Sequence, residues 1–266
     1  MDKRIIYRLL VFGVVLIILF SLACINQEGK LTPEEILNRS ETVMKNINSY
    51  AFDTSMLMRF SGNATRMVGG GEMSMKLNTN SKIDVNKKRM YMTGTMSLMG
   101  MSMPVEEYII ENTQYMKSPM GGWTKREIKI MWNDINMANK ISMIKKSNLT
   151  LEGSEGVSGE DCYIIKVTPT PKGVIDMIGR SMGDVSGMGE GKEEFLKAIK
   201  NVELKEWISK KDFTVRKAYI NMSLENMGTS VTIEITMNLH DFNKPMNIEL
   251  PDDARNATEI SKRLYY

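Results

Sequence analysis

Histidine and cysteine are almost absent from this chain. Its 266 residues include one histidine, His240, and two cysteines, Cys24 and Cys162. A lone imidazole argues against a histidine-rich zinc site and against Ser-His-Asp hydrolysis, because each needs an imidazole among other functional groups. Two cysteines supply no disulfide framework, so the apolar core must hold the fold. The sequence therefore predicts no catalytic residue, no metal and no cofactor, and we do not expect an enzyme.

A large excess of charge is lacking as well. The 35 basic and 32 acidic residues give a formal net charge of +3. Much of this excess lies at the start of the chain, where Lys3, Arg4 and Arg8 outnumber Asp2. The rest of the chain is close to neutral, so its charge gives no basis for a nucleic-acid partner.

An unbroken apolar run from Leu9 to Phe20 follows that basic start, and Ser21-Leu22-Ala23-Cys24 comes next. A charged start, a short apolar stretch and a small residue before a cleavage point are typical of an export signal. The block resembles the lipobox of prokaryotic lipoproteins, although Ser21 stands where that motif usually has leucine. The resemblance implies that residues 1–23 are a signal peptide and that Cys24 becomes the lipidated N-terminus.

An uncleaved membrane anchor is the alternative for this segment. Leu9 to Ala23 spans 15 residues, fewer than the ~20 that a helix needs to cross a bilayer, which favours the cleaved form. In both cases the chain from residue 25 onward lies outside the cytoplasm. We therefore expect a lipid anchor on the extracytoplasmic face of the cell membrane, with residues 24–31 as its tether.

One helix and many alternating segments account for most of the remaining chain. Thr32, Pro33 and Glu35 match a capping box at the start of a helix that ends near Asn48. The spacing of apolar residues predicts a second helix at 131–146. Alternation of apolar and polar residues predicts antiparallel strands with one wet face. These strands are residues 50–60, 72–78, 89–98, 106–111, 113–117, 149–158, 162–168, 202–209, 214–225 and 230–240.

About nine or more such strands with few helices predict an α+β fold. We expect a broad curved antiparallel sheet, an incomplete β-barrel, that wraps two or three helices, because a twisted sheet of that width tends to curl. The composition does not shift along residues 32–253, which predicts a single domain there and a C-terminal tail at 254–266. If the helices leave part of the concave side unfilled, an apolar cavity remains.

Methionine is the residue used in unusual number, with 25 in the chain. Met96, Met99, Met101 and Met103 cluster at a spacing that suits thioether ligation of Cu(I). Most of the others fall on apolar strand faces, which favours packing or cavity lining, where the flexible thioether adapts to many ligand shapes. The predicted cavity-lining residues are Phe52, Met56, Met58, Met73, Met75, Met90, Met92, Met96, Ile220, Met222, Val231, Ile233 and Ile235.

A glycine-rich stretch lies within residues 174–200, which we expect to be helical at both ends. It does not match a phosphate-binding loop, because Ser186 and Glu193 stand where glycine and Ser or Thr are required. Two interpretations stay open: a loop at the rim of the sheet that gates the cavity, and a plain surface loop. Cys162, just before a predicted strand, is expected to be a free thiol.

Five further motifs follow one another along roughly residues 32–252. They are Met44-Lys45-Asn46-Ile47-Asn48-Ser49-Tyr50, Tyr108 to Met116 with Gly122-Trp123 after it, Gly159-Glu160-Asp161-Cys162-Tyr163, Trp207 to Phe213, and Pro245 to Pro251. In this order they resemble a class of uncharacterised prokaryotic lipoproteins, which is similar to the outer-membrane lipoprotein carrier superfamily with its mycobacterial glycolipid-binding members. The resemblance implies an incomplete antiparallel barrel, a cavity for acyl chains and no catalytic motif.

Two functions of different kinds are consistent with these features. The first is a membrane-anchored protein that binds a lipid or another long apolar ligand in the concavity of the half-barrel. The alternative is a structural or interaction lipoprotein that contacts another envelope protein. The polar strand faces are rich in Thr, Ser, Asn and Lys and contain no large apolar patch of the kind that marks a standing partner site, which favours the first.

Overall fold

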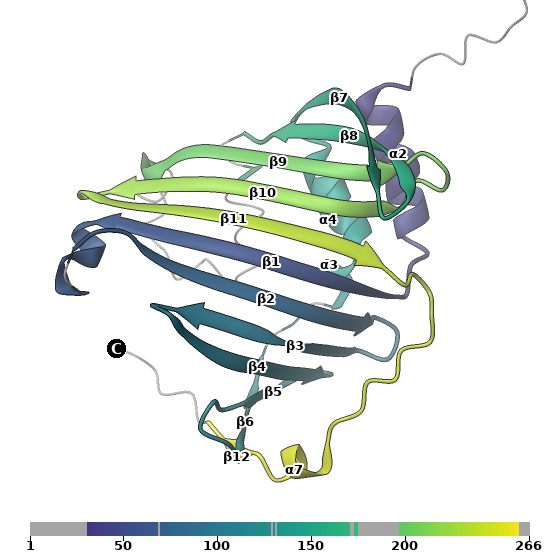
Figure 1. Cartoon of the computed structure of the whole chain (residues 1–266). Helices are drawn as coiled ribbons and strands as arrows, with labels where there is room; N and C mark the ends of the chain where they lie inside the picture. The colour runs from purple at the N-terminus through teal and green to yellow at the C-terminus, as the bar shows by residue number, and fades with distance from the viewer. Residues whose placement is uncertain are drawn as a thin grey trace, which may run out of the picture. The chain divides into compact units, whose positions relative to one another are not determined.

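The computed structural model describes residues 31–68, 70–128, 130, 132–170, 173–174 and 197–260. From Pro33 onward they belong to one compact unit, built on a single sheet of twelve strands (Figure 1). The strands are β1 (Ser49–Gly62), β2 (Met73–Asp84), β3 (Arg89–Leu98), β4 (Met101–Ile110), β5 (Thr113–Lys117), β6 (Trp123–Glu127), β7 (Asn148–Val157), β8 (Glu160–Thr168), β9 (Ile199–Ser209), β10 (Val215–Asn226), β11 (Thr229–His240) and β12 (Thr258–Glu259).

Two meanders make up the sheet, whose order is β12-β6-β5-β4-β3-β2-β1-β11-β10-β9-β8-β7. Within the first meander, β1 to β6, each strand pairs with the next one in sequence. The same holds within the second meander, β7 to β11. The long antiparallel pairing of β1 with β11 joins the two meanders, and only the β12–β6 pairing is parallel. The predicted large curved antiparallel sheet with few helices is therefore confirmed.

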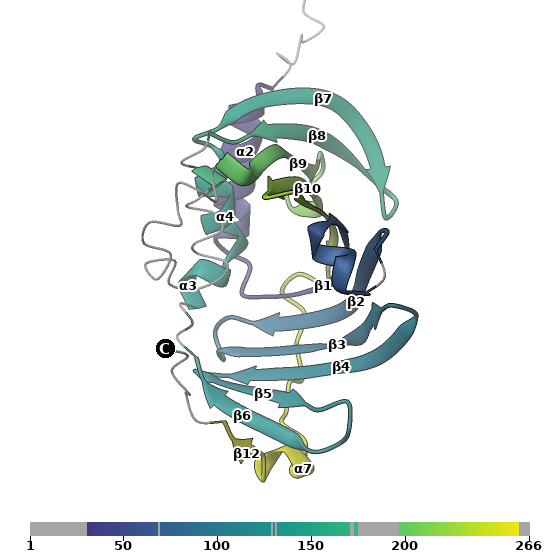
Figure 2. The ribbon, with the colours of Figure 1, turned by 90° about the vertical axis from the view of Figure 1, so that its left-hand side faces the viewer.

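Helices are short and few in the described part of the chain. They are α2 (Pro33–Met44), the 3-10 helix η1 (Asn63–Val68), α3 (Trp132–Ile135), α4 (Met137–Ile144) and α7 (Asp252–Arg255). None of them is both long and apolar enough to cross a membrane. The sheet curves around α2, α3 and α4, which lie on its concave side (Figure 2).

The predicted element boundaries differ from the structure in three places. The helix expected at 131–146 is divided at Asn136, whose side chain accepts a hydrogen bond from the Ala138 amide and so caps α4. Strand β4 begins at Met101 rather than at 106, and strands β6 and β12 were not predicted. Residues 123–127 and 258–259 lack the alternation that reveals a strand, so only their pairing shows them.

The predicted C-terminal tail begins inside α7. Ala254 and Ala257 lie in a buried cluster, and β12 adds to the edge of the sheet through β6. The glycine-rich middle of the 174–200 stretch, with its gating loop, lies outside the described residues, as do Cys24, the signal peptide and nearly all of the tether. Of the ends predicted to be helical, residues 174 and 197–198 are helical, whereas Ile199 and Lys200 begin β9.

A fully buried core lies between the concave side of the sheet and its helices. Helix α2 buries Ile36, Leu37 and Met44 on one stripe, and α4 buries Met137, Ala138, Ile141 and Ile144. The two helices are tied by the Lys145–Glu41 ion pair at 2.7 Å. Beneath them, Ile165, Val167 and Ile208 have no exposed surface. This helix-covered core is the apolar packing that a chain without a disulfide framework requires.

Candidate ligand-binding face

The thirteen predicted cavity-lining residues share one face of the sheet. Residues that pair directly across neighbouring strands lie on the same face, and the register places them opposite one another from strand to strand. The row Met222, Ile233, Met58 and Met75 crosses β10, β11, β1 and β2. The rows on either side contain the pairs Ile220–Ile235, Ile235–Met56, Val231–Phe60, Phe60–Met73 and Leu77–Met96.

This face is the concave one. Tyr50 and Phe52 lie two residues apart on β1, with their rings 5.9 Å apart, and the Tyr50 hydroxyl donates to the Ile135 carbonyl of α3 at 3.1 Å. Ala51, between them, packs against the C-terminal segment on the opposite face. The side chains that share a face with Phe52 therefore lie on the side of the sheet that faces the helices, which is the concave side in Figure 2.

Burial changes along this face. Phe52 and Leu239 at the helix-covered end are 9% and 3% exposed. The other twelve predicted residues are half-buried, neither sealed in a core nor fully exposed. On β2, Met73, Met75 and Leu77 are half-buried while Ser74, Lys76 and Asn78 on the other face are exposed. We call the twelve half-buried residues the concave band: Met56, Met58, Met73, Met75, Met90, Met92, Met96, Ile220, Met222, Val231, Ile233 and Ile235.

Strands β2 and β3 approach each other closely at Gly94, between Met92 and Met96 of the concave band. Gly94 on β3 faces Thr79 on β2, and a Cβ built on Gly94 would lie 2.0 Å from the Asn78 carbonyl oxygen. Any side chain at this position would therefore push the two strands apart.

Polar groups occupy this face near its β6 end. Glu107 accepts a hydrogen bond from the Gln114 amide at 2.7 Å, and Gln114 accepts one from Arg126 at 2.6 Å. Burial raises the pKa of Glu107, while its bond to Gln114 and the charge of Arg126 act in the opposite direction. Its neighbour Glu106 pairs with Lys117 at 2.9 Å. The two adjacent carboxylates thus have separate partners and form no acid–base pair, as their position in a strand predicts.

A second polar position lies near the other end of the face, and sequence reasoning missed it. Glu206 on β9 stands opposite Ile165 of β8 and Ala218 of β10. Its Oε2 atom is buried and has no hydrogen-bond partner. Desolvation raises the pKa of Glu206 to about 8, and Lys140 on α4 partly opposes this shift. The signal was present in the sequence, because Glu206 interrupts the apolar alternation of Val202, Leu204 and Ile208.

The chain's own C-terminal segment covers part of the convex face. Residues 244–260 pack over this side of β1 to β6, where Met246, Ile248 and Ala254 are buried. Tyr108 is buried there between Tyr91 at 4.6 Å and Trp123 at 5.8 Å, measured between ring centroids. Burial raises the pKa of Tyr108 to about 12. The segment is held by backbone bonds such as that from the Asn243 amide to the Ser49 carbonyl at 2.7 Å.

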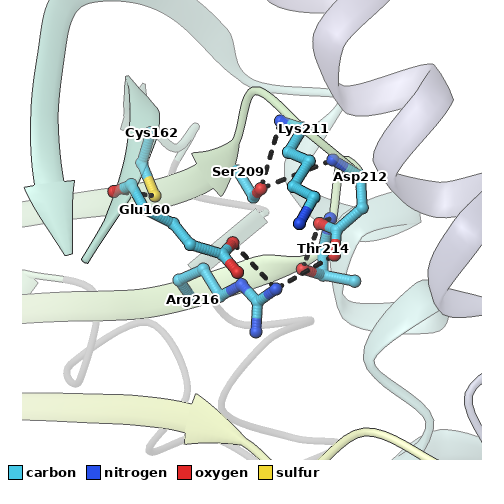
Figure 3. A network of polar contacts seen from close by, with 7 residues as sticks. All are labelled: Glu160, Cys162, Ser209, Lys211, Asp212, Thr214 and Arg216. Carbon is cyan, nitrogen blue, oxygen red and sulfur yellow. Dashed lines mark hydrogen bonds and ion pairs between the residues drawn. The ribbon is translucent and has the colours of Figure 1, made fainter. Parts of the chain in front are cut away.

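A network of hydrogen bonds and ion pairs ties the far end of the sheet together (Figure 3). Arg216 forms ion pairs with Asp212 at 2.9 Å and with Glu160 at 2.8 Å. The contact with Glu160 lacks the alignment of a hydrogen bond. Thr214 donates its hydroxyl hydrogen to Asp212 at 2.6 Å. Nearby, Cys162 is a buried free thiol, as predicted, and burial raises its pKa. Such a thiol has little thiolate character.

The methionine cluster is spread over two environments. Met96 and Met103 pair across β3 and β4 and are half-buried. Met99 lies in the turn between these strands with a positive φ, and it is 56% exposed, while Met101 is 63% exposed. The three tryptophans, Trp123, Trp132 and Trp207, are all buried. Among the described residues no group of three or more His, Cys, Asp or Glu side chains is placed to hold a metal ion.

These features define a lipoprotein-carrier-like fold, an open curved antiparallel sheet with helices in its concavity. A family model matches residues 32–259, and the chain belongs to that family, the family of unknown function DUF6612. No protein with a curated description matches the chain.

Two solved structures align with the chain at low sequence identity. LprF from Mycobacterium bovis aligns with a TM-score of 0.51 and 14% identity, over 82% of this chain and 96% of that one. The Mycobacterium tuberculosis lipoprotein LppX aligns with a TM-score of 0.46 and 13% identity, over 81% and 97%. At such identity the likeness to LprF establishes the fold alone.

Proposed function

We propose that this protein is a membrane-anchored extracytoplasmic lipoprotein that binds a lipid or another long apolar ligand on the concave band and catalyses no reaction. The single observation that carries this proposal is the continuous row of half-buried apolar side chains across β10, β11, β1, β2 and β3. Apolar surface that remains partly in water at the centre of a sheet is stabilised when an apolar ligand covers it.

The composition of the concave band supports a flexible ligand. Eight of its twelve members are methionine, namely Met56, Met58, Met73, Met75, Met90, Met92, Met96 and Met222. Unbranched thioether side chains adapt their rotamers to the ligand, and a surface built from them is tolerant of ligand shape. Acyl chains have many conformations and one chemistry, which fits such a surface.

Photo-crosslinking of the full chain tests this proposal. The probe is a phosphatidylcholine whose acyl chain carries a diazirine, and labelled residues are mapped by tandem mass spectrometry. We expect saturable labelling of Met58, Met75 and Ile233, which unlabelled lipid suppresses. Met75→Lys should lose the labelling, and Ser74→Lys, an exposed neighbour on the convex face, should keep it. Labelling that is absent, or that does not saturate, would reject lipid binding and favour an envelope interaction module.

Anchoring is tested separately at Cys24. Its thiol is the only acylation point next to the proposed cleavage site, so Cys24→Ser should abolish incorporation of a fatty-acid analogue in cells and leave precursor or released protein. Equal incorporation into the wild type and the variant would contradict lipidation at this residue.

A further inference from the structure

Lys140 and Glu206 are two charged residues on the concave side that interact electrostatically without direct contact. Each acts on the other electrostatically, yet the two do not form an ion pair. On β9 the carboxylate of Glu206 rises from a face whose neighbours, Ile165 and Ala218, are apolar. The Glu206 Oε2 atom is buried and has no hydrogen-bond partner. A buried carboxylate oxygen without a partner is costly and calls for an explanation.

Lys140 approaches this position from the helix side. It lies on α4 at the edge of the stripe formed by Met137, Ile141 and Ile144, away from Lys145, which pairs with Glu41 on α2. The Lys140 side chain is exposed to water, yet surrounding protein desolvates its ammonium group and lowers its pKa.

The contrast with the other carboxylates is informative. Glu107 on the same face has Gln114 as its partner, and Glu160 has Arg216. Among the charged groups described here, only Lys140 acts on Glu206; those of α2 and of the β9–β10 turn are engaged elsewhere, Glu41 with Lys145 and Asp212 with Arg216. Glu206 and Lys140 are therefore available to a ligand.

We propose that Lys140 and Glu206 form a site for the anionic polar end of an amphipathic lipid, a carboxylate or phosphate group, whose acyl chain lies along the concave band. This inference rests on the proposed function. The Lys140 ammonium attracts the anion, and the Glu206 carboxyl in its protonated form donates a hydrogen bond to one of its oxygens. Two charge-assisted donors in a desolvated place are the strong kind of hydrogen bond.

The site joins the band without interruption. Glu206 stands opposite Ala218, Ala218 opposite Met237, and Met237 opposite Thr54 on β1. The next row along these strands contains Ile220, Ile235 and Met56 of the concave band. A ligand with its polar end at Glu206 therefore has a path of apolar side chains toward β2 and β3.

Protonation supports the role of Glu206. Burial raises its pKa to about 8, so the carboxyl is largely a neutral donor near pH 7. Above that pH it becomes an anion, which neutralises Lys140 and repels the ligand. A bound anion in turn favours the charged form of Lys140 and reverses the lowering of its pKa.

Displacement of an uncharged fluorescent acyl probe from the full chain tests the site. Palmitate and dipalmitoyl phosphatidate are compared with their neutral counterparts hexadecanol and dipalmitoylglycerol. We expect each anionic ligand to bind about tenfold or more tightly than its neutral counterpart. A carboxylate preference without a phosphate preference, or the reverse, identifies which headgroup the site takes. Acetate and inorganic phosphate alone should displace nothing, and displacement by them would overturn the lipid assignment.

Variants assign the effect to the two residues. Lys140→Met should remove the preference for anionic ligands, whereas Lys140→Arg and the exposed control Lys146→Met should keep it. Glu206→Leu should weaken the preference for anionic ligands. Glu206→Gln retains a hydrogen-bond donor, so this variant should keep the preference and should not lose it above pH 8. Equal binding of anionic and neutral ligands, unchanged by these variants, would overturn this inference and leave the proposed function standing. Failure of every ligand to displace the probe would instead reject the proposed function.

Discussion

The concave side of the sheet has two regions that differ in what covers them. Under α2 and α4 the side chains of Ile165, Val167 and Ile208 have no exposed surface. A few residues further along β1 and β11, Met56, Met58 and Ile233 are half-buried. Both regions have the same alternation and the same apolar residue types. The difference shows that alternation decides which face a residue occupies, while the length of the covering helices decides whether that face is core or remains open to a ligand.

The largest effect is expected from a charge in the helix-covered core. Ile208→Lys places an ammonium at a position with no exposed surface, and we expect a loss of about 4 kcal/mol or more in the free energy of unfolding. Urea denaturation followed by circular dichroism measures it. A loss below that of the matched band variant Ile233→Lys would show that the two regions do not differ in the way proposed.

The part of the convex face under the C-terminal segment should lose stability when a buried side chain there is shortened. Ile248 is 2% exposed beneath the C-terminal segment, so Ile248→Ala should cost about 2–3 kcal/mol, the transfer of its methyl groups plus a cavity. Ile260→Ala, at a residue that is 47% exposed, is the control and should cost little. Equal stability of both variants would mean that residues 244–260 do not pack on the sheet in solution.

Glu206 should make stability depend on pH. Its pKa of about 8 in the folded chain exceeds its ordinary value of 4.5, so between these pH values the unfolded chain has released a proton that the folded chain keeps. Stability therefore falls as the pH rises through this window and levels off above it. Glu206→Gln should reduce the fall between pH 5 and pH 8.5 by about 1–2 kcal/mol, because water in the concavity lessens the full value of the shift.

Thermal unfolding of the wild type and Glu206→Gln at both pH values, in matched ionic strength, is the measurement. Lys140 has the opposite effect on the pH dependence of stability. Burial lowers its pKa in the folded chain, so stability rises with pH until the ordinary pKa of lysine is reached. Lys140→Met should therefore steepen the fall that Glu206 causes. An identical pH profile for wild type and Glu206→Gln would contradict the assigned environment of the carboxyl.

The smallest effect on stability is expected in the concave band, where the effect on binding is large. Ile233→Lys or Met92→Lys should cost less than about 1 kcal/mol, because a half-buried lysine extends its ammonium group into water. The same variants should lose lipid crosslinking. Thr232→Lys, next to Ile233 on the other face, is the matched control. Retained labelling in both band variants would place the ligand elsewhere.

The sequence by itself determined most of the strands, the face that their residues occupy and the free thiol of Cys162. Strict alternation has a period of two, so the assignment of Met73, Met75 and Leu77 to one face needs no tertiary information. The same reasoning placed all thirteen cavity-lining residues on a common face. Apolar packing was required from the start, since a chain with two cysteines has no other means to hold a sheet of this size.

Only the tertiary structure decided which parts of that face are covered and which polar groups meet there. Glu206 and Lys140 are 66 positions apart in the sequence, and their electrostatic interaction depends on the place of α4 on the concave side of the sheet. The packing of residues 244–260 on the convex face is likewise a long-range contact without a periodic signal. Alternation is a property of neighbours along the chain, whereas coverage and electrostatic pairing depend on segments that meet only after folding.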